Sequence, residues 1–218
     1  MKKLVIVLLI FLIACSKQDS EPMITKEDPE QPIDELLDQE TVQETPQEKE
    51  SLEVEFVLED EIITLNTKNI TILGAYLNTV NNRKEAISNM KLEKLDIDRL
   101  YLLSFNCNPA TCSYLLLDRN EPNRSFLVDD LINLKEVIPS PDQSMLLFII
   151  NEFQADTWKV FNLEEWTTTK FDPPPPEEIR IQMATWLDEE SINIEYQQFP
   201  DNIVQEMTIS KPQEQLFD

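Results

Sequence analysis

The sequence predicts a mainly β fold with one amphipathic helix, built from small antiparallel sheets. Three features of the 218 residues support this prediction. Apolar and polar residues alternate in several short segments, a stretch near residues 70–90 has a helical period, and a weak repeat of 46 residues runs from about residue 92 to 209. An irregular α+β antiparallel sheet is the alternative fold.

The chain begins with the parts of a secretory signal. Residues 1–3 form a cationic head of Met and two Lys, and an uninterrupted apolar run of ten residues follows at 4–13. This run is too short to cross a bilayer as a helix, which takes ~20 residues. We therefore expect residues 1–14 to be a leader that is removed on export.

The end of this leader, Leu12-Ile13-Ala14-Cys15, resembles the lipobox of bacterial lipoproteins. The resemblance implies cleavage before Cys15 and transfer of a diacylglyceryl group to its thiol. That group would anchor the chain in the cell membrane at the extracytoplasmic face, since stable anchoring takes more than one acyl chain. An ordinary signal peptide or an uncleaved anchor is the alternative.

Residues 15–50 are predicted to be an acidic, unstructured tether. From residue 16 to 50 the chain holds three Lys against twelve Asp or Glu. Such a segment cannot bury enough apolar surface to offset the entropy cost of ordering. The folded unit is therefore expected to span residues 51–218.

A strand pair and an amphipathic helix are predicted for residues 51–91. Leu52, Val54 and Phe56 alternate with glutamates, as in a half-buried strand, and residues 61–65 are expected to return as a second strand. From residue 70 to 90 the apolar positions follow a helical period. We expect this face to join the core, the alternative being a partner-binding surface; it consists of Leu73, Tyr76, Leu77, Val80, Ile87 and Met90.

The 46-residue repeat defines the region 92–218. Asp96, Asp142 and Asp188 are evenly spaced, and each is expected in a turn where its side chain accepts a hydrogen bond from the backbone two residues on. Alternating apolar residues follow each Asp and predict a strand. The repeated apolar positions are Leu100, Leu146 and Ile192, then Leu102, Phe148 and Ile194. Further strands are expected at 113–117, 125–129, 158–163 and 203–209.

At these residues the chain resembles a β-propeller of the TolB or WD40-like kind. Residues 140–144, Ser-Pro-Asp-Gln-Ser, are similar to the Ser-Pro-Asp-Gly-Lys turn that opens a strand in such blades, and residues 186–189 are a variant of it. Gln143 and Glu189 stand where that family usually has Gly. Two complete units and a partial third are too few to close a ring, which takes at least about four blades. The resemblance implies blade-like sheets in an incomplete propeller that serves as an interaction platform.

Cys107 and Cys112 are predicted to form a disulfide that closes a hairpin loop. The pair is even in number, suits an oxidising compartment, and encloses Asn108-Pro109, which favours a turn. A redox-active or free pair is the alternative. Zinc is not expected, because two Cys without His leave its coordination shell incomplete.

Two further sequence features have a structural and a functional interpretation. Residues 171–177 contain four consecutive prolines and are expected to be a stiff connector, the alternative being a ligand for an aromatic groove on a partner. Trp158, Trp166 and Trp186 are expected to pack beside the strands, the alternative being stacking on sugars or bases.

The composition excludes several classes of function. The chain has no His, which excludes Ser-His-Asp and Cys-His catalysis and His metal sites, and it has a single Gly, which excludes Gly-rich phosphate loops. Its net charge of −24 repels nucleic acid. We therefore expect no cofactor and no nucleic-acid partner.

The many carboxylates are expected to form a solvated acidic surface rather than a catalytic pair. Adjacent acidic residues, as at 129–130, 164–165, 177–178 and 188–190, point to opposite faces of a strand, whereas acid–base catalysis needs two carboxyls across a cleft. Calcium binding by Asp96 and Asp98 is a weaker alternative, since no complete acidic loop surrounds them. We expect no catalytic residue and no metal site.

Together these features predict a membrane-anchored, non-enzymatic binding or scaffolding module of the bacterial envelope. Its expected partners are the membrane, through lipid on Cys15, and an unidentified envelope protein or small ligand. A lipoprotein that binds or senses a solute or cation is the first alternative. A hydrolase of wall polymer that uses two carboxylates is the second.

Overall fold

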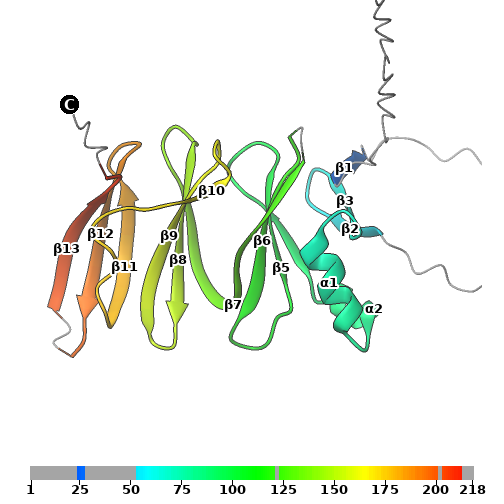
Figure 1. Ribbon diagram of the computed structural model, residues 1–218, viewed down its shortest axis with the longest axis horizontal. Helices are drawn as coiled ribbons and strands as arrows, with labels where there is room; N and C mark the ends of the chain where they lie inside the picture. Colours follow the sequence, from blue (N-terminus) through cyan, green and yellow to red (C-terminus); the bar gives the residue numbers. More distant parts are fainter. Residues whose placement is uncertain (1–23, 28–52, 121–122, 201–202, 213–218) are drawn as a thin grey trace, which may run out of the picture.

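The structure, a computed structural model, describes residues 24–27, 53–120, 123–200 and 203–212. Its sheets stand face to face in a row, with two helices and a small sheet at one end of the row (Figure 1). The sheets are antiparallel, and none of those described closes into a barrel or ring. The prediction of a mainly β fold in antiparallel sheets is confirmed.

The first layer contains a small sheet with the strand order β1-β3-β2. Its strands are β1 (Ile24–Glu27), β2 (Glu53–Val57) and β3 (Ile62–Asn66). The predicted strand pair is confirmed, but β1 lies inside the segment 15–50 that was expected to be unstructured. It pairs along its length with the edge of β3 that faces away from β2. These backbone hydrogen bonds stabilise a strand that the residues of β1 do not predict by themselves. The leader, Cys15 and the rest of residues 15–50 lie outside the described residues.

Two short helices replace the single predicted helix. They are α1 (Thr71–Thr79) and α2 (Arg83–Ser88). The break occurs because Asn82 caps α2: its side-chain oxygen accepts the Glu85 N–H at 3.1 Å, and its amide donates to the Glu85 carboxylate at 3.0 Å. The predicted apolar face does join the core; Leu73, Leu77 and Met90 are buried, and Tyr76, Val80 and Ile87 pack against them.

A seven-stranded sheet follows, in the order β10-β9-β8-β7-β6-β5-β4. Residues 124–132 of β7 pair with β6 and residues 133–139 pair with β8. Between the two parts, Leu131 has a φ of 51°, and β7 passes from one layer of the stack to the next (Figure 1). The strands are β4 (Lys91–Lys94), β5 (Leu100–Phe105), β6 (Cys112–Asp118), β7 (Arg124–Pro139), β8 (Met145–Glu152), β9 (Ala155–Asn162) and β10 (Thr167–Thr169).

The last layer is a three-stranded sheet of β11 (Ile179–Trp186), β12 (Ser191–Gln198) and β13 (Ile203–Ser210). Together, β5, β8 and β12 are the strands that follow the repeated aspartates. The predicted bonds are present in two turns: Asp142 accepts the Ser144 N–H at 3.1 Å, and Asp188 accepts the Glu190 N–H at 2.8 Å. Gln143, at the position where the similar turns have glycine, adopts the left-handed φ of 61° that glycine favours.

Three layers of apolar side chains hold the stack together. One lies between the helices with their small sheet and β4–β6, one between the two halves of the seven-stranded sheet, and one between β8–β9 and the last sheet. All six repeated apolar positions are buried. The outer side of β12 carries Asn193 and Glu195, so the middle of this outer face is polar, with Met183 and Val204 exposed on the strands beside it.

A buried carboxylate connects the small sheet to the large one. Glu61 immediately precedes β3, its side chain is 2% exposed, and it accepts hydrogen bonds from Tyr101 at 2.9 Å and pairs with Lys94 at 3.2 Å and Arg119 at 3.9 Å. Burial alone would raise the pKa of Glu61, but these hydrogen bonds and charges outweigh it and lower the pKa. Burial and the bond to Glu61 raise the pKa of Tyr101 to about 12.

We expect this carboxylate to make stability depend on pH. Because the pKa of Glu61 in the folded chain lies below its ordinary value of 4.5, the stabilisation is complete above pH 4.5 and is lost as the pH falls through the folded-state pKa. Glu61→Gln should lower the free energy of unfolding at pH 7 by about 2 kcal/mol. Urea titrations should show a smaller difference from the native chain at pH 3. Glu55→Gln, at an exposed position of β2, is the control. An equal difference at both pH values for Glu61→Gln would contradict the assignment.

The single glycine, Gly74, is expected to be required for packing. A Cβ at this position in α1 would lie 2.8 Å from the Thr67 carbonyl oxygen. Gly→Ala normally stabilises an exposed helix by about 1 kcal/mol, but Gly74→Ala should lower the free energy of unfolding by about 1–3 kcal/mol. Asn78→Ala, on the exposed side of the same helix, should be neutral or stabilising in the same urea titration. Stabilisation by both substitutions would show that α1 moves freely away from Thr67.

Candidate functional site

A groove of about 760 Å³ lies between β4, β5 and residues 133–139 of β7, and we call it the β4–β7 groove. Four buried or half-buried apolar side chains, Leu95, Leu102, Leu134 and Val137, line its floor. Most of the exposed residues along it are polar. They include Asn89, Lys91, Glu93, Asn108, Lys135 and Glu136.

The fold creates this groove because both strands along it are paired on one edge only. Among the described residues, β4 pairs with β5 alone, and residues 133–139 of β7 pair with β8 alone. Each of the two is the first strand of a repeat unit. The groove therefore has a free strand edge of each neighbouring layer along it, and its lining also includes Leu102 and Ser104 of β5 and Tyr114 of β6.

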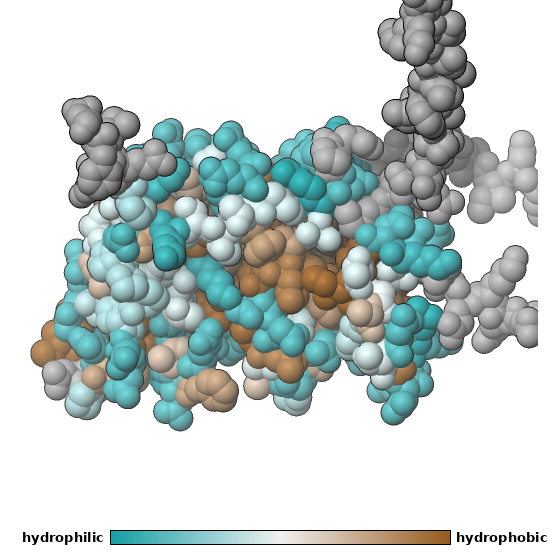
Figure 2. All heavy atoms as spheres, viewed as in Figure 1, coloured by the Kyte–Doolittle hydropathy of each residue, from teal (hydrophilic) through white to brown (hydrophobic). Residues whose placement is uncertain are grey.

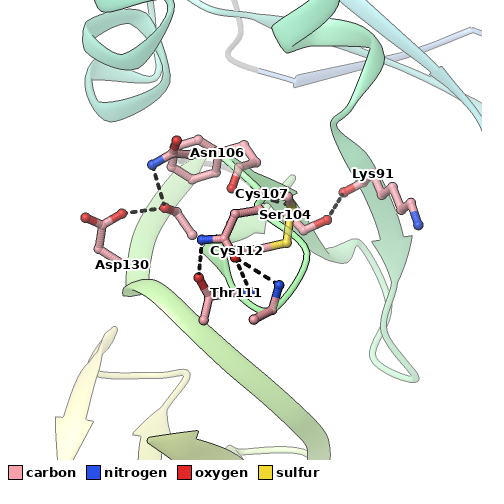
Figure 3. Close-up of a disulfide and its surroundings, with 11 residues drawn as sticks. Lys91, Ser104, Asn106, Cys107, Thr111, Cys112 and Asp130 are labelled. Atoms are coloured by element: carbon pink, nitrogen blue, oxygen red, sulfur yellow. Dashed lines mark hydrogen bonds between the residues drawn. A yellow bond between two sulfur atoms is a disulfide. The ribbon is translucent and has the colours of Figure 1, made fainter. Parts of the chain in front are cut away.

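The predicted disulfide, drawn in Figure 3, belongs to the lining of the groove at the β5–β6 loop. Cys107 and Cys112 are bonded across the hairpin loop between β5 and β6, with their Cα atoms 4.1 Å apart. Inside the loop, the Asn108 side-chain oxygen accepts the N–H groups of Ala110 at 2.9 Å and Thr111 at 3.0 Å. In the chain-entropy model, closing so short a loop stabilises the fold by about 2 kcal/mol. This part of the groove is therefore ordered by covalent and hydrogen bonds.

Next to the disulfide, polar side chains connect the strands around the loop. Ser104 donates to the Lys91 carbonyl oxygen at 3.4 Å and joins β5 to β4. The Asn106 amide donates to the Ser113 hydroxyl at 3.4 Å, and Ser113 in turn donates to Asp130 of β7, as Figure 3 shows. These contacts hold the loop against β7.

The other side of the groove is fixed by Lys135, which occupies a bulge of β7. Its Nζ lies 2.7 Å from the buried carboxylate of Asp156 and donates to the Ile181 carbonyl oxygen at 3.1 Å. Asp156 also accepts hydrogen bonds from the Ile181 N–H at 2.8 Å and from Asn151 at 2.7 Å. The ion pair thus connects the groove to the last sheet of the stack.

The electrostatics of the groove differ from those of the whole chain. Lys91 and Lys135 lie along it with Glu93 and Glu136, so the groove carries charges of both signs although the chain has a net charge of −24, and the Lys135 charge is already paired with Asp156. Burial raises the pKa of the Tyr114 hydroxyl, and the charge of Glu93 raises it further, so this side chain stays neutral. An apolar floor with a few polar groups along it is typical of a binding site.

Several of the acidic residues noted in the sequence have individual partners in the structure. The adjacent Asp129 and Asp130 have different partners, Lys159 and Ser113. Hydrogen bonds from Ser191 and the Glu190 N–H lower the pKa of Asp188, which is opposite to the shift that a general acid requires. Asp98 lies 3.6 Å from Arg99. The described residues contain no group of three His, Cys, Asp or Glu that would hold a metal ion.

The tryptophans and the proline segment have structural roles. Trp158 and Trp186 are buried in the core, and Trp186 donates to the Ile138 carbonyl oxygen at 3.2 Å. Trp166 is partly buried, with the Arg124 guanidinium 4.3 Å from its ring centre. The segment 171–177 connects β10 to β11, as predicted for a connector. No helix within the described ranges is long and apolar enough to cross a membrane.

The sequence did not reveal the β4–β7 groove itself. Cys107, Cys112, the turn between them and the repeat position Leu102 were singled out, and the structure places them along it, but the other lining residues carry no motif. The repeat contained the relevant signal, because it makes β4 and the second half of β7 equivalent first strands. Comparison with protein-family models, curated proteins and solved structures finds no match. The fold and site thus define an open stack of antiparallel sheets with a groove lined in part by a disulfide.

Proposed function

We propose that this chain is a lipid-anchored, extracytoplasmic, non-enzymatic binding module of the bacterial envelope, and that the β4–β7 groove is its binding surface. The observation that carries the proposal is the groove itself, with its apolar floor, charges of both signs and disulfide-bonded loop. Its volume of about 760 Å³ lies within the ~300–1,000 Å³ of known ligand sites. Because two free strand edges lie along it, it suits an extended segment of an envelope protein.

Two observations support the location. The leader ends in the lipobox-like residues 12–15, and the Cys107–Cys112 disulfide is of the kind that persists in oxidising compartments. The sheets also support a kinship with propeller blades, since the units share a strand, an Asp-containing turn and two further strands. In this interpretation the three units are blades of an incomplete propeller, and the groove lies where neighbouring first strands face each other.

The anchor is tested on Cys15. We expect the full chain, expressed with its leader in a bacterium, to incorporate an alkyne-labelled palmitate and to fractionate with membranes. Cys15→Ala should lose the label and leave the membrane fraction, whereas the double variant Cys107→Ser/Cys112→Ser should keep both properties. Mass spectrometry that finds an unmodified Cys15 in the native chain would contradict the anchor.

The groove is tested by site-specific cross-linking. A photo-reactive amino acid at Ser104, in the full anchored chain, should form a discrete adduct with an envelope protein. The same amino acid at Asn193, on the outer side of the last sheet, is the matched control and should not form it. Identical adducts from both positions, or none from Ser104, would reject the groove as the binding surface.

A thermal-shift panel of metals and metabolites distinguishes the small-ligand alternative, because a ligand at 100 times its Kd adds about 2.7 kcal/mol to stability.

A further inference from the structure

The free edge of β13 is a second feature that points to a partner. Ser210 exchanges both backbone hydrogen bonds with Asp172, at 2.8 and 2.9 Å, on the side away from β12. Since strand residues alternate in the direction of their backbone groups, the N–H and C=O groups of Val204, Glu206 and Thr208 also point away from β12. Among the described residues, none of these groups has a backbone partner.

The proline segment explains why this edge is free. In the other layers a fourth strand completes the unit: residues 124–132 of β7 pair with β6, and β10 pairs with β9. In the last layer Asp172 begins the same kind of antiparallel pairing at Ser210. The next four residues, 173–176, are prolines without an N–H, so the pairing cannot continue. The last layer therefore has three strands, one fewer than each of the two layers before it.

This edge lacks the features that usually protect an edge strand. Proteins commonly place Lys, Pro or a bulge on a free edge to prevent pairing with other chains. The eight residues of β13 contain neither Lys nor Pro, and their pairing with β12 is continuous. Two apolar side chains are exposed there, Ile203 at 61% and Val204 at 50%. The edge is therefore open to addition of a strand.

Charge around the edge selects the partner. Residues 172–211 contain nine Asp or Glu against two Lys or Arg, and Glu206 is the charged residue of β13 itself. A second copy of this chain would bring the same negative charges together, whereas an extended segment with Lys or Arg would neutralise them.

We infer that β13 binds an extended, cationic segment of another protein, which adds as an antiparallel fourth strand along Val204, Glu206 and Thr208. Alternate residues of that segment lie on the same face of the sheet as Glu206 and are Lys or Arg. The residues between them lie on the side of Ile203 and Met207 and are apolar. This is strand addition at a sheet edge, in which backbone hydrogen bonds supply affinity and alternate side chains supply specificity.

The test measures binding of a fluorescent eight-residue peptide of alternating Lys and Val, capped at both ends, to the detergent-solubilised full chain. We expect saturable binding by fluorescence anisotropy that weakens with salt, and at least tenfold weaker binding of a Glu-Val peptide. Glu206→Pro should also weaken binding at least tenfold, since it removes an outward N–H that β12 does not use. Glu206→Gln keeps that N–H and is the matched control, with a loss of about twofold expected from one fewer charge.

Two further measurements make every outcome decisive. Circular dichroism and the Tm of Glu206→Pro should match the native chain. If that variant fails to fold, a Lys-Val peptide methylated on alternate amide nitrogens takes its place and should bind at least tenfold more weakly than its parent. The inference would be overturned if Glu206→Pro, or the methylated peptide in its place, left binding unchanged. It would also be overturned if the Glu-Val peptide bound as tightly as the Lys-Val peptide. A concentration-dependent dimer that Glu206→Pro abolishes would overturn it as well, because the occupant would then be a second copy. None of these results depends on the β4–β7 groove.

Discussion

Every residue of β8 from Met145 to Ile150 is buried, and its side chains alternate between two separate cores. Met145, Leu147 and Ile149 face the last sheet, and the residues between them face the first half of the large sheet. β5 is arranged in the same way between the helical layer and β8. A sheet that is apolar on both faces must be covered on both faces, so these two strands require a row of layers.

The two ends of the row satisfy the same constraint differently. At one end α1, α2 and the small sheet cover the large sheet, and Glu61 joins them through Tyr101, Lys94 and Arg119. At the other end the last sheet is apolar on one face only. Between these ends, on the side shown in Figure 2, hydrophobic residues gather over the middle of the stack, around β5–β7 in Figure 1. Among the described residues, the sheets are covered face to face, whereas β4, residues 133–139 of β7 and β13 each keep an edge without a paired strand.

The sequence predicted those parts of the fold that depend on local chemistry. The Asp turns, the strands that follow them, the disulfide and the apolar face of the helical segment all depend on residues within a few positions of one another. The break between α1 and α2 was missed because it depends on Asn82 capping the second helix, which the helical period of the apolar residues does not reveal. The strand β1 and the long β7 were missed because they depend on distant partners, and no glycine marks the bend at Leu131. The groove depends on two strands about 40 residues apart in sequence, and neither carries a motif.

The two candidate surfaces are both strand edges, but their chemistry separates their partners. The β4–β7 groove has an apolar floor and carries two lysines and two glutamates, so shape and apolar contact would select its ligand. β13 pairs with β12 on one side only among the described strands, and its other edge lies in the most one-sided charge environment of the sheets. Its free backbone groups result from one feature of the sequence, the four prolines that follow Asp172. A connector without prolines would be free to continue along β13 and complete the fourth strand, as β7 and β10 do in the other layers. The composition of this connector therefore determines both the path between two sheets and the availability of the last edge.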